Sequence, residues 1–409
     1  MNDKARLAAF KAFSRIAKGA YSNLLSDFGE LKSIDRAFAE SIALGTLERK
    51  VTLEWVLSKY VKSGTKKDIL YLLMTGVYQI LYMDRVPDSA ACDETVTLAK
   101  SIFGQRSAGF VNAVLREICR SRDKLLSDIE SSEGYIKYSA NEELYRLLES
   151  QYGSDIDNIF GAFFGKSNTV LRVNTLKSDA VSVANAIGGE VISDTTVICG
   201  EPQKALALIA SGEFYIQGLA SQRAVALLGA ERGQTVIDVC ACPGGKSLGA
   251  AIDMCNEGKV LSFDLHANKL PLIEKSAKTL GIDIIKTAKQ DARVAKEELF
   301  GAADRVICDV PCSGSGVMGS KPEIKYKSPS DFCGLYTTQR AIIRTAAKYL
   351  KAGGVMVYST CSINKLENEE IIKDFLLENG GYRLICEETC LPYGKEKEGF
   401  YMAKIKREF

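Results

Sequence analysis

The 409-residue chain has one histidine, one tryptophan, only 8 prolines and no pair of cysteines at CxxC spacing. With His266 as its only histidine, acid–base chemistry must come from Asp, Glu, Lys or Cys side chains. The one close cysteine pair, Cys240 and Cys242, has no second pair at zinc-ligand spacing, so we expect no metal. The longest apolar run, 69–83, has 15 residues, whereas a membrane span needs roughly 20. We therefore expect a buried helix there and no membrane contact.

The chain also lacks a large net charge, because it contains 53 Lys and Arg and 51 Asp and Glu. The distribution is uneven, since residues 1–124 carry 20 basic and 14 acidic side chains. Such a surplus attracts phosphate backbones, but a solvated helical surface explains it equally well. The sequence has 12 cysteines and its N-terminus does not resemble a secretory signal. This combination favours a cytoplasmic chain with reduced thiols.

The hydrophobic periodicity changes twice along the chain, which predicts a multidomain protein. Apolar residues at three- and four-residue spacing predict an all-α domain over 1–130. Short strand candidates (170–173, 190–192) mixed with a helix (142–152) predict a small α+β subdomain over 131–215. From 216 to 409 the pattern becomes an α/β alternation. It predicts a parallel, doubly wound sheet of Rossmann-like type, with strands at 235–239, 260–264, 284–286, 305–309 and 355–359 separated by helices.

The first motif is a glycine-bearing turn, 240–246, between a buried strand and an apolar helix. Gly244 and Gly245 allow close approach of a ligand, and the helix N-terminus offers free N–H groups. A phosphate-binding P-loop is the alternative, because Gly245-Lys246-Ser247 matches the end of that pattern. Cys240 stands where the first P-loop glycine is required, which argues against this alternative.

Two acids follow at the ends of the next strands. Asp264 lies 19 residues beyond Gly245, where an acid in a dinucleotide-type fold accepts hydrogen bonds from ribose hydroxyls. Its alternative role is to cap the helix over 269–280. Asp291 follows the third strand and is placed to meet an adenine amino group. A cap or turn residue is again the alternative.

Two further loops each place a cysteine directly after a strand. One is 309–316, with Asp309, Pro311 and Cys312, and the other is 358–362, with Cys361. Because consecutive parallel strands often lie side by side, both thiols are expected to face one pocket. A chance cysteine in a plain turn is the alternative for Cys312.

This set of residues suits the methylation of cytosine carbon 5, which is itself a poor nucleophile. A thiolate that adds to carbon 6 makes carbon 5 able to attack a sulfonium methyl group. An acid near nitrogen 3 can hydrogen-bond the base edge, and a second thiol can assist release. Spacing does not say which thiol attacks, since DNA cytosine methyltransferases use a Pro-Cys motif like Pro311-Cys312.

Together the DVCACPGGK, DVPCSGSG and STCS stretches resemble the bacterial Sun (Fmu) and nucleolar-protein family of RNA cytosine-carbon-5 methyltransferases. Residues 171–174, 321–326 and 398–401 support this resemblance. The N-terminal part resembles the NusB-like helical domain at 35–38, 78–81 and 109–116. The combination is similar to the members that act on 16S rRNA. The resemblance implies a class I methyltransferase domain, S-adenosyl-L-methionine as cofactor and 16S rRNA as partner. We separately expect a monomer.

The resemblance also implies the role of each site residue. Cys361 becomes the nucleophile and Cys312 the group that assists release, with Asp309 reaching the base. The cofactor site comprises Cys240, Ala241, Cys242, Pro243, Gly244, Gly245, Lys246, Asp264, Asp291 and Asp309. The family pattern is broken at Cys242 (commonly alanine), Gly218 (often an acid) and Glu398 (usually Asp). A tRNA or large-subunit rRNA methyltransferase, and a non-catalytic RNA-binding assembly factor, stay as alternatives.

Overall fold

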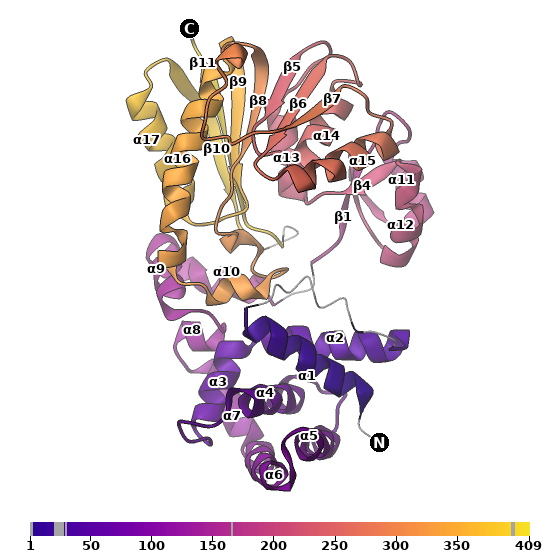
Figure 1. Cartoon of the computed structure of the whole chain (residues 1–409), viewed down its shortest axis with the longest axis vertical. Coiled ribbons are helices and arrows are strands. Elements are labelled where there is room, and N and C mark those ends of the chain that lie inside the picture. Colours follow the sequence, from indigo (N-terminus) through magenta and orange to yellow (C-terminus); the bar gives the residue numbers. More distant parts are fainter. Residues whose placement is uncertain (1–2, 20–27, 29–30, 165–166, 394–396) are drawn as a thin grey trace. The chain divides into compact units, whose positions relative to one another are not determined.

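The computed structural model describes residues 3–19, 28, 31–164, 167–393 and 397–409 (Figure 1). The chain divides into two compact units, one of residues 1–164 with 320–329 and the other of 165–319 with 330–409. The predicted domain boundaries at 130 and 215 stay predictions. Within the described ranges, no helix is both long enough and apolar enough to cross a membrane.

The first unit is built from helices, as the periodicity of residues 1–130 predicts. The first helix begins where the Asp3 side chain accepts the backbone N–H groups of Ala5 and Arg6. The helices are α1 (Lys4–Ala17), α2 (Ser33–Glu48), α3 (Lys50–Ser58), α4 (Lys67–Tyr82), α5 (Asp88–Phe103), α6 (Gln105–Arg120), α7 (Arg122–Glu130), α8 (Gly134–Lys137), α9 (Glu142–Tyr152) and α10 (Ile156–Ala162).

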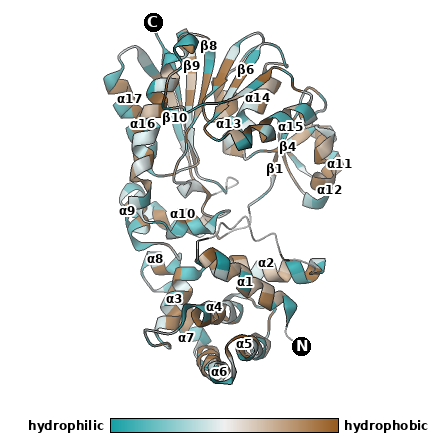
Figure 2. Cartoon of the chain, in the orientation of Figure 1, coloured by the Kyte–Doolittle hydropathy of each residue, from teal (hydrophilic) through white to brown (hydrophobic). Residues whose placement is uncertain are grey.

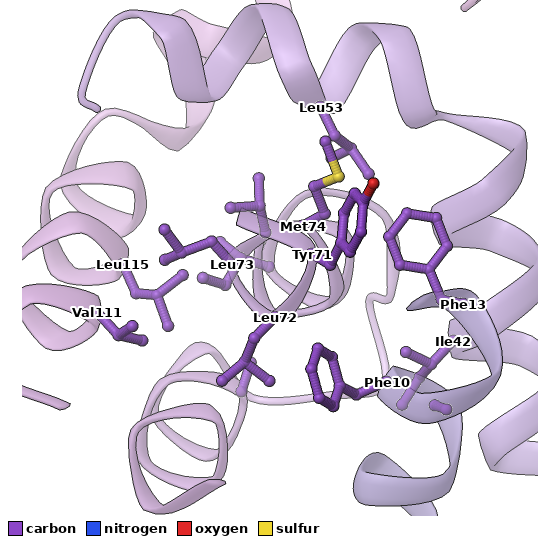
Figure 3. Close-up of a cluster of buried hydrophobic side chains, with 14 of the residues drawn as sticks. Phe10, Phe13, Ile42, Leu53, Tyr71, Leu72, Leu73, Met74, Val111 and Leu115 are labelled. Atoms are coloured by element: carbon purple, nitrogen blue, oxygen red, sulfur yellow. The ribbon is translucent and has the colours of Figure 1, made fainter. Parts of the chain in front are cut away.

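The apolar run at 69–83 forms the buried helix α4, as predicted, and lies at the centre of this unit. Apolar residues gather along it in Figure 2, and Figure 3 shows α1, α3 and α6 contributing side chains around it. Phe13 and Tyr71 meet edge to face with ring centroids 5.7 Å apart. Each large apolar side chain buried in this way contributes roughly 1.5–3 kcal/mol to folding.

The segment 320–329 belongs to the helical unit although the chain on either side of it belongs to the second unit. It supplies donors to the C-terminal end of α2, where helix carbonyls lack partners within the helix. Lys325 Nζ donates to the Glu48 carbonyl (2.8 Å), and the Tyr326 hydroxyl donates to the Leu47 carbonyl. Burial lowers the pKa of Lys325 to about 7.

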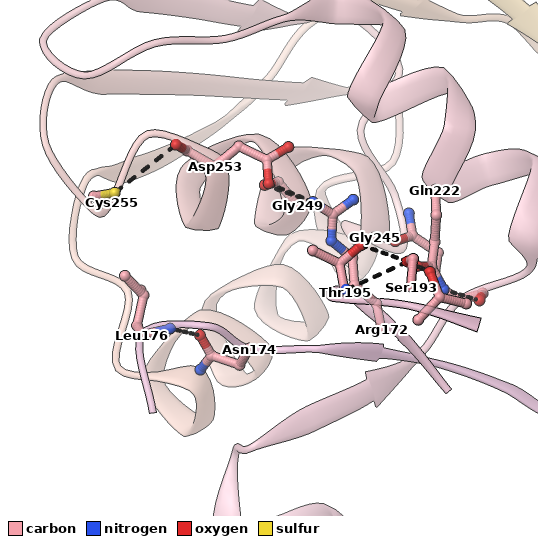
Figure 4. Close-up of polar contacts among 12 residues, drawn as sticks. Arg172, Asn174, Leu176, Ser193, Thr195, Gln222, Gly245, Gly249, Asp253 and Cys255 are labelled. Carbon is pink, nitrogen blue, oxygen red and sulfur yellow. Dashed lines mark hydrogen bonds and ion pairs between the residues drawn. The ribbon is translucent and has the colours of Figure 1, made fainter. Parts of the chain in front are cut away.

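The second unit contains a small antiparallel sheet in the order β2-β3-β1-β4. Its strands are β1 (Val170–Val173), β2 (Glu190–Ser193), β3 (Thr196–Ile198) and β4 (Phe214–Ile216), accompanied by α11 (Ala180–Ile187) and α12 (Pro202–Leu208). Arg172 of β1 is buried and donates to Asp253 (2.6 Å) and to the Gly249 carbonyl (3.4 Å) of α14 (Gly245–Asp253), as Figure 4 shows. The small sheet is thereby fixed to the helix that follows the glycine turn.

The large sheet has seven strands in the order β10-β11-β9-β8-β5-β6-β7. They are β5 (Thr235–Asp238), β6 (Lys259–Asp264), β7 (Ile285–Lys289), β8 (Ala303–Asp309), β9 (Leu350–Thr360), β10 (Tyr382–Cys390) and β11 (Phe400–Arg407). One face packs against α13 (Leu219–Leu228), α14 and α15 (Leu270–Leu280). The other packs against α16 (Cys333–Lys348) and α17 (Glu369–Glu378). The predicted doubly wound architecture is confirmed.

Two details of that prediction were wrong. The sheet is mixed, because β10 and β11 pair antiparallel with each other and β11 pairs antiparallel with β9. The connection from β7 to β8 contains only a 3-10 turn (Glu297–Leu299) in place of an α-helix. The five strands predicted from sequence are the parallel ones, so their carboxyl ends share one edge of the sheet.

Candidate active site

The predicted motifs lie at the carboxyl ends of the parallel strands. Strand β6 ends at Asp264, β8 ends at Asp309 and β9 ends at Thr360, one residue before Cys361. The glycine turn follows β5, and Asp291 lies two residues beyond β7. Ligands of open α/β sheets bind beyond these strand ends. The structure thus brings together motifs that are spread over more than 120 residues of sequence.

Cys312 and Cys361 lie next to each other, with their sulfur atoms 3.3 Å apart. The pairing of β8 with β9 causes this, because the register sets Asp309 opposite Ser359 just before the two loops. Both cysteines are reduced and partly exposed. The hydrogen bond with Cys361, together with burial, raises the pKa of the Cys312 thiol well above its usual range. One small site therefore contains two thiols, of which Cys312 is held in the protonated form.

Asp309 forms a polar cluster beside the thiols. Its carboxylate accepts hydrogen bonds from Lys246 Nζ (2.7 Å) and from the Ser359 hydroxyl (2.6 Å). The Asp309 side chain is 32% exposed, so a substrate can still reach it. The Lys246 ammonium also lies 5.3 Å from the centre of the Phe400 ring. Lys246 of the glycine turn and Asp309 of the thiol loop therefore belong to the same site.

The glycine turn is supported from below by a buried hydrogen-bond chain. Gly244 has a φ of 111°, in the region that favours glycine, and α14 begins at the next residue. The Ser262 hydroxyl donates to Ser247, which donates to Asp238 (2.8 and 2.6 Å). Burial raises the pKa of Asp238 to about 7. Asp238 thus supports the glycine turn through its hydrogen bond with Ser247. Its position inside a strand did not predict this role.

The remaining residues of the turn lie between β5 and β6. Ala241 donates its N–H to the Phe263 carbonyl (2.7 Å), and the Cys242–Pro243 peptide bond is cis. Burial raises the pKa of the Cys240 thiol well above its usual range and that of Cys242 to about 12. We therefore assign these two cysteines to shaping the turn and find no reactive thiolate in them.

Asp264 is not the helix cap that the alternative interpretation required. Its carboxylate accepts the backbone N–H groups of Cys242 (3.2 Å) and His266 (2.9 Å), whereas the N-cap position of α15 is Lys269. Asp264 therefore connects the turn to β6. Asp291 forms an ion pair with Arg293 (2.6 Å), which lowers the pKa of the Asp291 carboxyl. These local contacts are those of a turn residue, the alternative interpretation of Asp291.

The residue that joins the two thiol loops was not predicted from the sequence. Glu367 is fully buried and accepts hydrogen bonds from Ser313 and Ser362, the residues that follow the two thiols. Only the hydroxyl-rich composition around both cysteines hinted at such an acceptor.

Two of the departures from the family pattern meet in space. A Cβ atom built on Gly218 would lie 2.6 Å from a carboxylate oxygen of Glu398. A side chain at position 218 and the longer acid at position 398 therefore compete for the same volume. Gly218 leaves room for the Glu398 carboxylate.

The order of the parallel strands, with the glycine turn after β5 and acids after its neighbours, defines a Rossmann-like methyltransferase. Family models match both parts of the chain: "16S rRNA methyltransferase RsmB/F" over residues 225–406 and "NusB family" over residues 3–120. The chain belongs to the RsmB/F family of 16S rRNA methyltransferases.

Individual relatives extend over most of the sequence. A probable ribosomal RNA small subunit methyltransferase B of Bacillus subtilis is 34% identical over 88% of this chain and 85% of its own length. A protein of the same description from Synechocystis is 29% identical over 91% of each chain. The crystal structure of PH0851 shares the fold, with a TM-score of 0.81 and 22% identity over 100% of this chain and 99% of that chain.

Proposed function

We propose that this rRNA methyltransferase methylates carbon 5 of a cytosine in 16S rRNA through a covalent bond between Cys361 and the base. The observation that carries the proposal is the 3.3 Å separation of the Cys312 and Cys361 sulfur atoms at the ends of neighbouring strands. Enzymes that transfer a methyl group to an unactivated ring carbon need a nucleophile and a group that reverses its addition. Two adjacent thiols meet both needs.

The cofactor of this enzyme class, S-adenosyl-L-methionine, fits the donors along the strand ends. It carries hydroxyl groups, amino groups and a positively charged sulfur, so it needs acceptors and negative charge. Asp264, Asp291 and Asp309 end or follow three strands of one sheet edge and offer carboxylate oxygens. The free N–H groups at the start of α14 suit its carboxylate tail. When bound, the cofactor supplies an electrophilic methyl group, which carbon 5 accepts as the carbon–sulfur bond breaks and its electron pair stays on sulfur.

The residues of the chain carry the other steps. The Cys361 sulfur forms a bond to carbon 6, the π bond between carbons 5 and 6 opens, and nitrogen 3 gains a proton. Asp309 is placed to pass this proton, and Lys246 and Ser359 hold its carboxylate in position. Cys312 supplies that proton from its thiol and then, as the thiolate, takes the proton from carbon 5 after methylation while the double bond re-forms. Cys361 then leaves as the thiolate and nitrogen 3 loses its proton, so the base gains a methyl group and one proton is released.

We also propose that the helical unit binds the RNA backbone. A cleft of about 660 Å³ in this unit is lined by Lys50, Lys62, Lys67 and Glu54. Lys50 pairs with Glu54 (2.8 Å), whereas Lys62 and Lys67 are exposed. Two exposed lysines beside hydroxyl groups and an apolar floor suit single-stranded RNA, whose phosphates they can neutralise. The cleft supports the interpretation that the basic surplus of residues 1–124 serves to bind RNA.

Two unlinked thiols 3.3 Å apart would readily join in an oxidising compartment, which supports action in the reducing cytoplasm. The remaining expectations, a monomer without a metal, stay part of this proposal.

The proposal is tested by incubating the protein and labelled S-adenosyl-L-methionine with protein-free 16S rRNA, 23S rRNA and tRNA. We expect label in 5-methylcytidine of 16S rRNA only, located by bisulfite sequencing. Label in tRNA or 23S rRNA would assign the enzyme to another substrate. Label at a ring nitrogen or at a ribose would contradict the two-thiol chemistry.

A further inference from the structure

One buried acid touches both thiol loops and takes no part in the proposed reaction steps. Glu367 lies at the end of a 3-10 turn (Lys365–Glu367), six residues after Cys361, and its exposed fraction is 0%. One carboxylate oxygen accepts the Ser313 N–H (2.8 Å) and the Gln339 side-chain amide (3.0 Å). The other accepts the hydroxyls of Ser313 (2.5 Å) and Ser362 (2.6 Å). Both serines directly follow the proposed reactive cysteines.

A buried carboxylate is costly unless its hydrogen bonds are satisfied. Four donors surround Glu367, and the described residues give it no ion pair with a lysine or arginine. These four hydrogen bonds to the carboxyl group all come from the two thiol loops and from α16. Hydrogen bonds to an ionised acceptor are short and directional. They fix positions more tightly than an apolar contact of the same size would.

Further hydrogen bonds support Glu367 and the four donors around its carboxyl group, which we call the clamp. The Tyr358 hydroxyl donates to the Glu367 carbonyl (2.7 Å), which ties the clamp to β9. The hydroxyls of Ser315 and Ser362 lie 2.8 Å apart, and the Gly316 N–H donates to the Cys361 carbonyl (3.0 Å). Hydrogen bonds therefore join the loop that carries Cys312 to the loop that carries Cys361 at several points.

We propose that Glu367 is a positioning residue whose carboxylate joins the two cysteine loops and thereby sets the distance between their sulfur atoms. The inference rests on the proposed function, because a fixed sulfur–sulfur distance matters only if both thiols act on one base. Addition by Cys361 and proton removal by Cys312 occur at adjacent carbons of the ring. A misplacement of about 1 Å between catalytic groups costs on the order of 10²-fold in rate.

Diamide oxidation measures this distance without any methyl transfer. Two thiols lose two electrons and two protons and form one disulfide, and diamide takes up both electrons and both protons as it becomes the hydrazine. The chain contains its own reference, because Cys92 and Cys119 of the helical unit have sulfur atoms 3.4 Å apart and no contact with Glu367. Mass spectrometry of the two linked peptides gives the ratio of the two rates.

We expect Glu367→Ala to slow formation of the Cys312–Cys361 disulfide by about 10-fold or more relative to the Cys92–Cys119 disulfide. Glu367→Gln keeps one acceptor oxygen and should restore much of that rate. Glu370→Gln, one turn further along, removes an acid that pairs with Lys373 on the surface (3.7 Å) and should leave the ratio unchanged. In methyl transfer, Glu367→Ala should lower kcat while the Kd for S-adenosyl-L-methionine stays the same.

An unchanged ratio of disulfide rates in Glu367→Ala would overturn the inference. If Glu367→Ala does not fold, as judged by circular dichroism, the same ratio in Ser362→Ala decides, because this change removes one clamp bond and keeps the acid. The disulfide assay is independent of the proposed function. If Cys361→Ala stays active, the proposed function fails, whereas the role of Glu367 can still hold. If Cys361→Ala is inactive but the ratio of disulfide rates in Glu367→Ala is unchanged, the proposed function holds and the role of Glu367 fails.

Discussion

The chain contains two pairs of cysteines with almost the same geometry and very different surroundings. Cys92 of α5 and Cys119 of α6 lie 3.4 Å apart, and Cys312 and Cys361 lie 3.3 Å apart. The first pair is on helices whose apolar faces form the core of the helical unit. The second pair is on loops at the ends of parallel strands, beside an acid, a lysine and a buried polar clamp. Closeness of two thiols is therefore not enough to make a site.

The comparison shows what converts a cysteine pair into a candidate site. Burial raises the pKa of Cys92 to about 12, and the pKa of Cys312 is raised as well, so the pKa of the thiols does not separate the two pairs. At the second pair the sheet edge supplies partly exposed thiols, and Asp309 stays accessible while Lys246 and Ser359 hold it. The difference comes from the secondary structure beneath each pair, because helix faces pack together whereas strand ends leave an open edge.

The largest expected effect separates the two pairs directly. Cys361→Ala removes the proposed nucleophile and should lower methyl transfer by about 10³-fold or more. Cys119→Ala removes a matched thiol of the helical unit and should leave the rate unchanged, because that thiol packs against the core of its own unit. Initial rates with 16S rRNA at saturating cofactor give both values. Equal losses in the two variants would mean that neither thiol attacks the base.

A smaller effect is expected from the lysine-lined cleft of the helical unit. Lys62→Glu with Lys67→Glu should weaken RNA binding and lower the salt dependence, the slope of log K against log salt, by about 1.4, or roughly 0.7 for each lost phosphate contact. Lys11→Glu reverses a charge on α1 outside the cleft and serves as the control. Filter binding at several salt concentrations gives the slopes. Equal slopes in both variants would remove the cleft from the RNA-binding surface.

Much of the fold could be predicted because it depends on local pattern. The strand Val170–Val173 and the helix Glu142–Tyr152 have the predicted bounds, and β8 and β9 contain the predicted strands. The antiparallel strands β10 and β11 were missed. Five of the nine residues of β10 are exposed, so the strand gives no continuous apolar run. A helix was predicted between β7 and β8, but the structure has a 3-10 turn there. The spacing between two strands does not distinguish these possibilities.

The site shows the same division. The structure places Cys312, Cys361 and Asp309 on one edge because strand ends converge, and this follows from the α/β pattern alone. Glu367 was missed because its role depends on three segments, around residues 313, 339 and 362, that meet only in the folded chain. No spacing rule in the sequence connects them.

The most direct test of the account is to locate the covalent bond between protein and RNA. In Cys312→Ala the bond to carbon 6 can form, but the proposed release group is absent, so a stable complex with 16S rRNA should accumulate in the presence of S-adenosyl-L-methionine. Digestion and mass spectrometry are expected to show a methylated cytidine attached to the peptide that contains Cys361. No adduct in Cys312→Ala, together with an adduct through Cys312 in Cys361→Ala, would contradict the account and reverse the two roles.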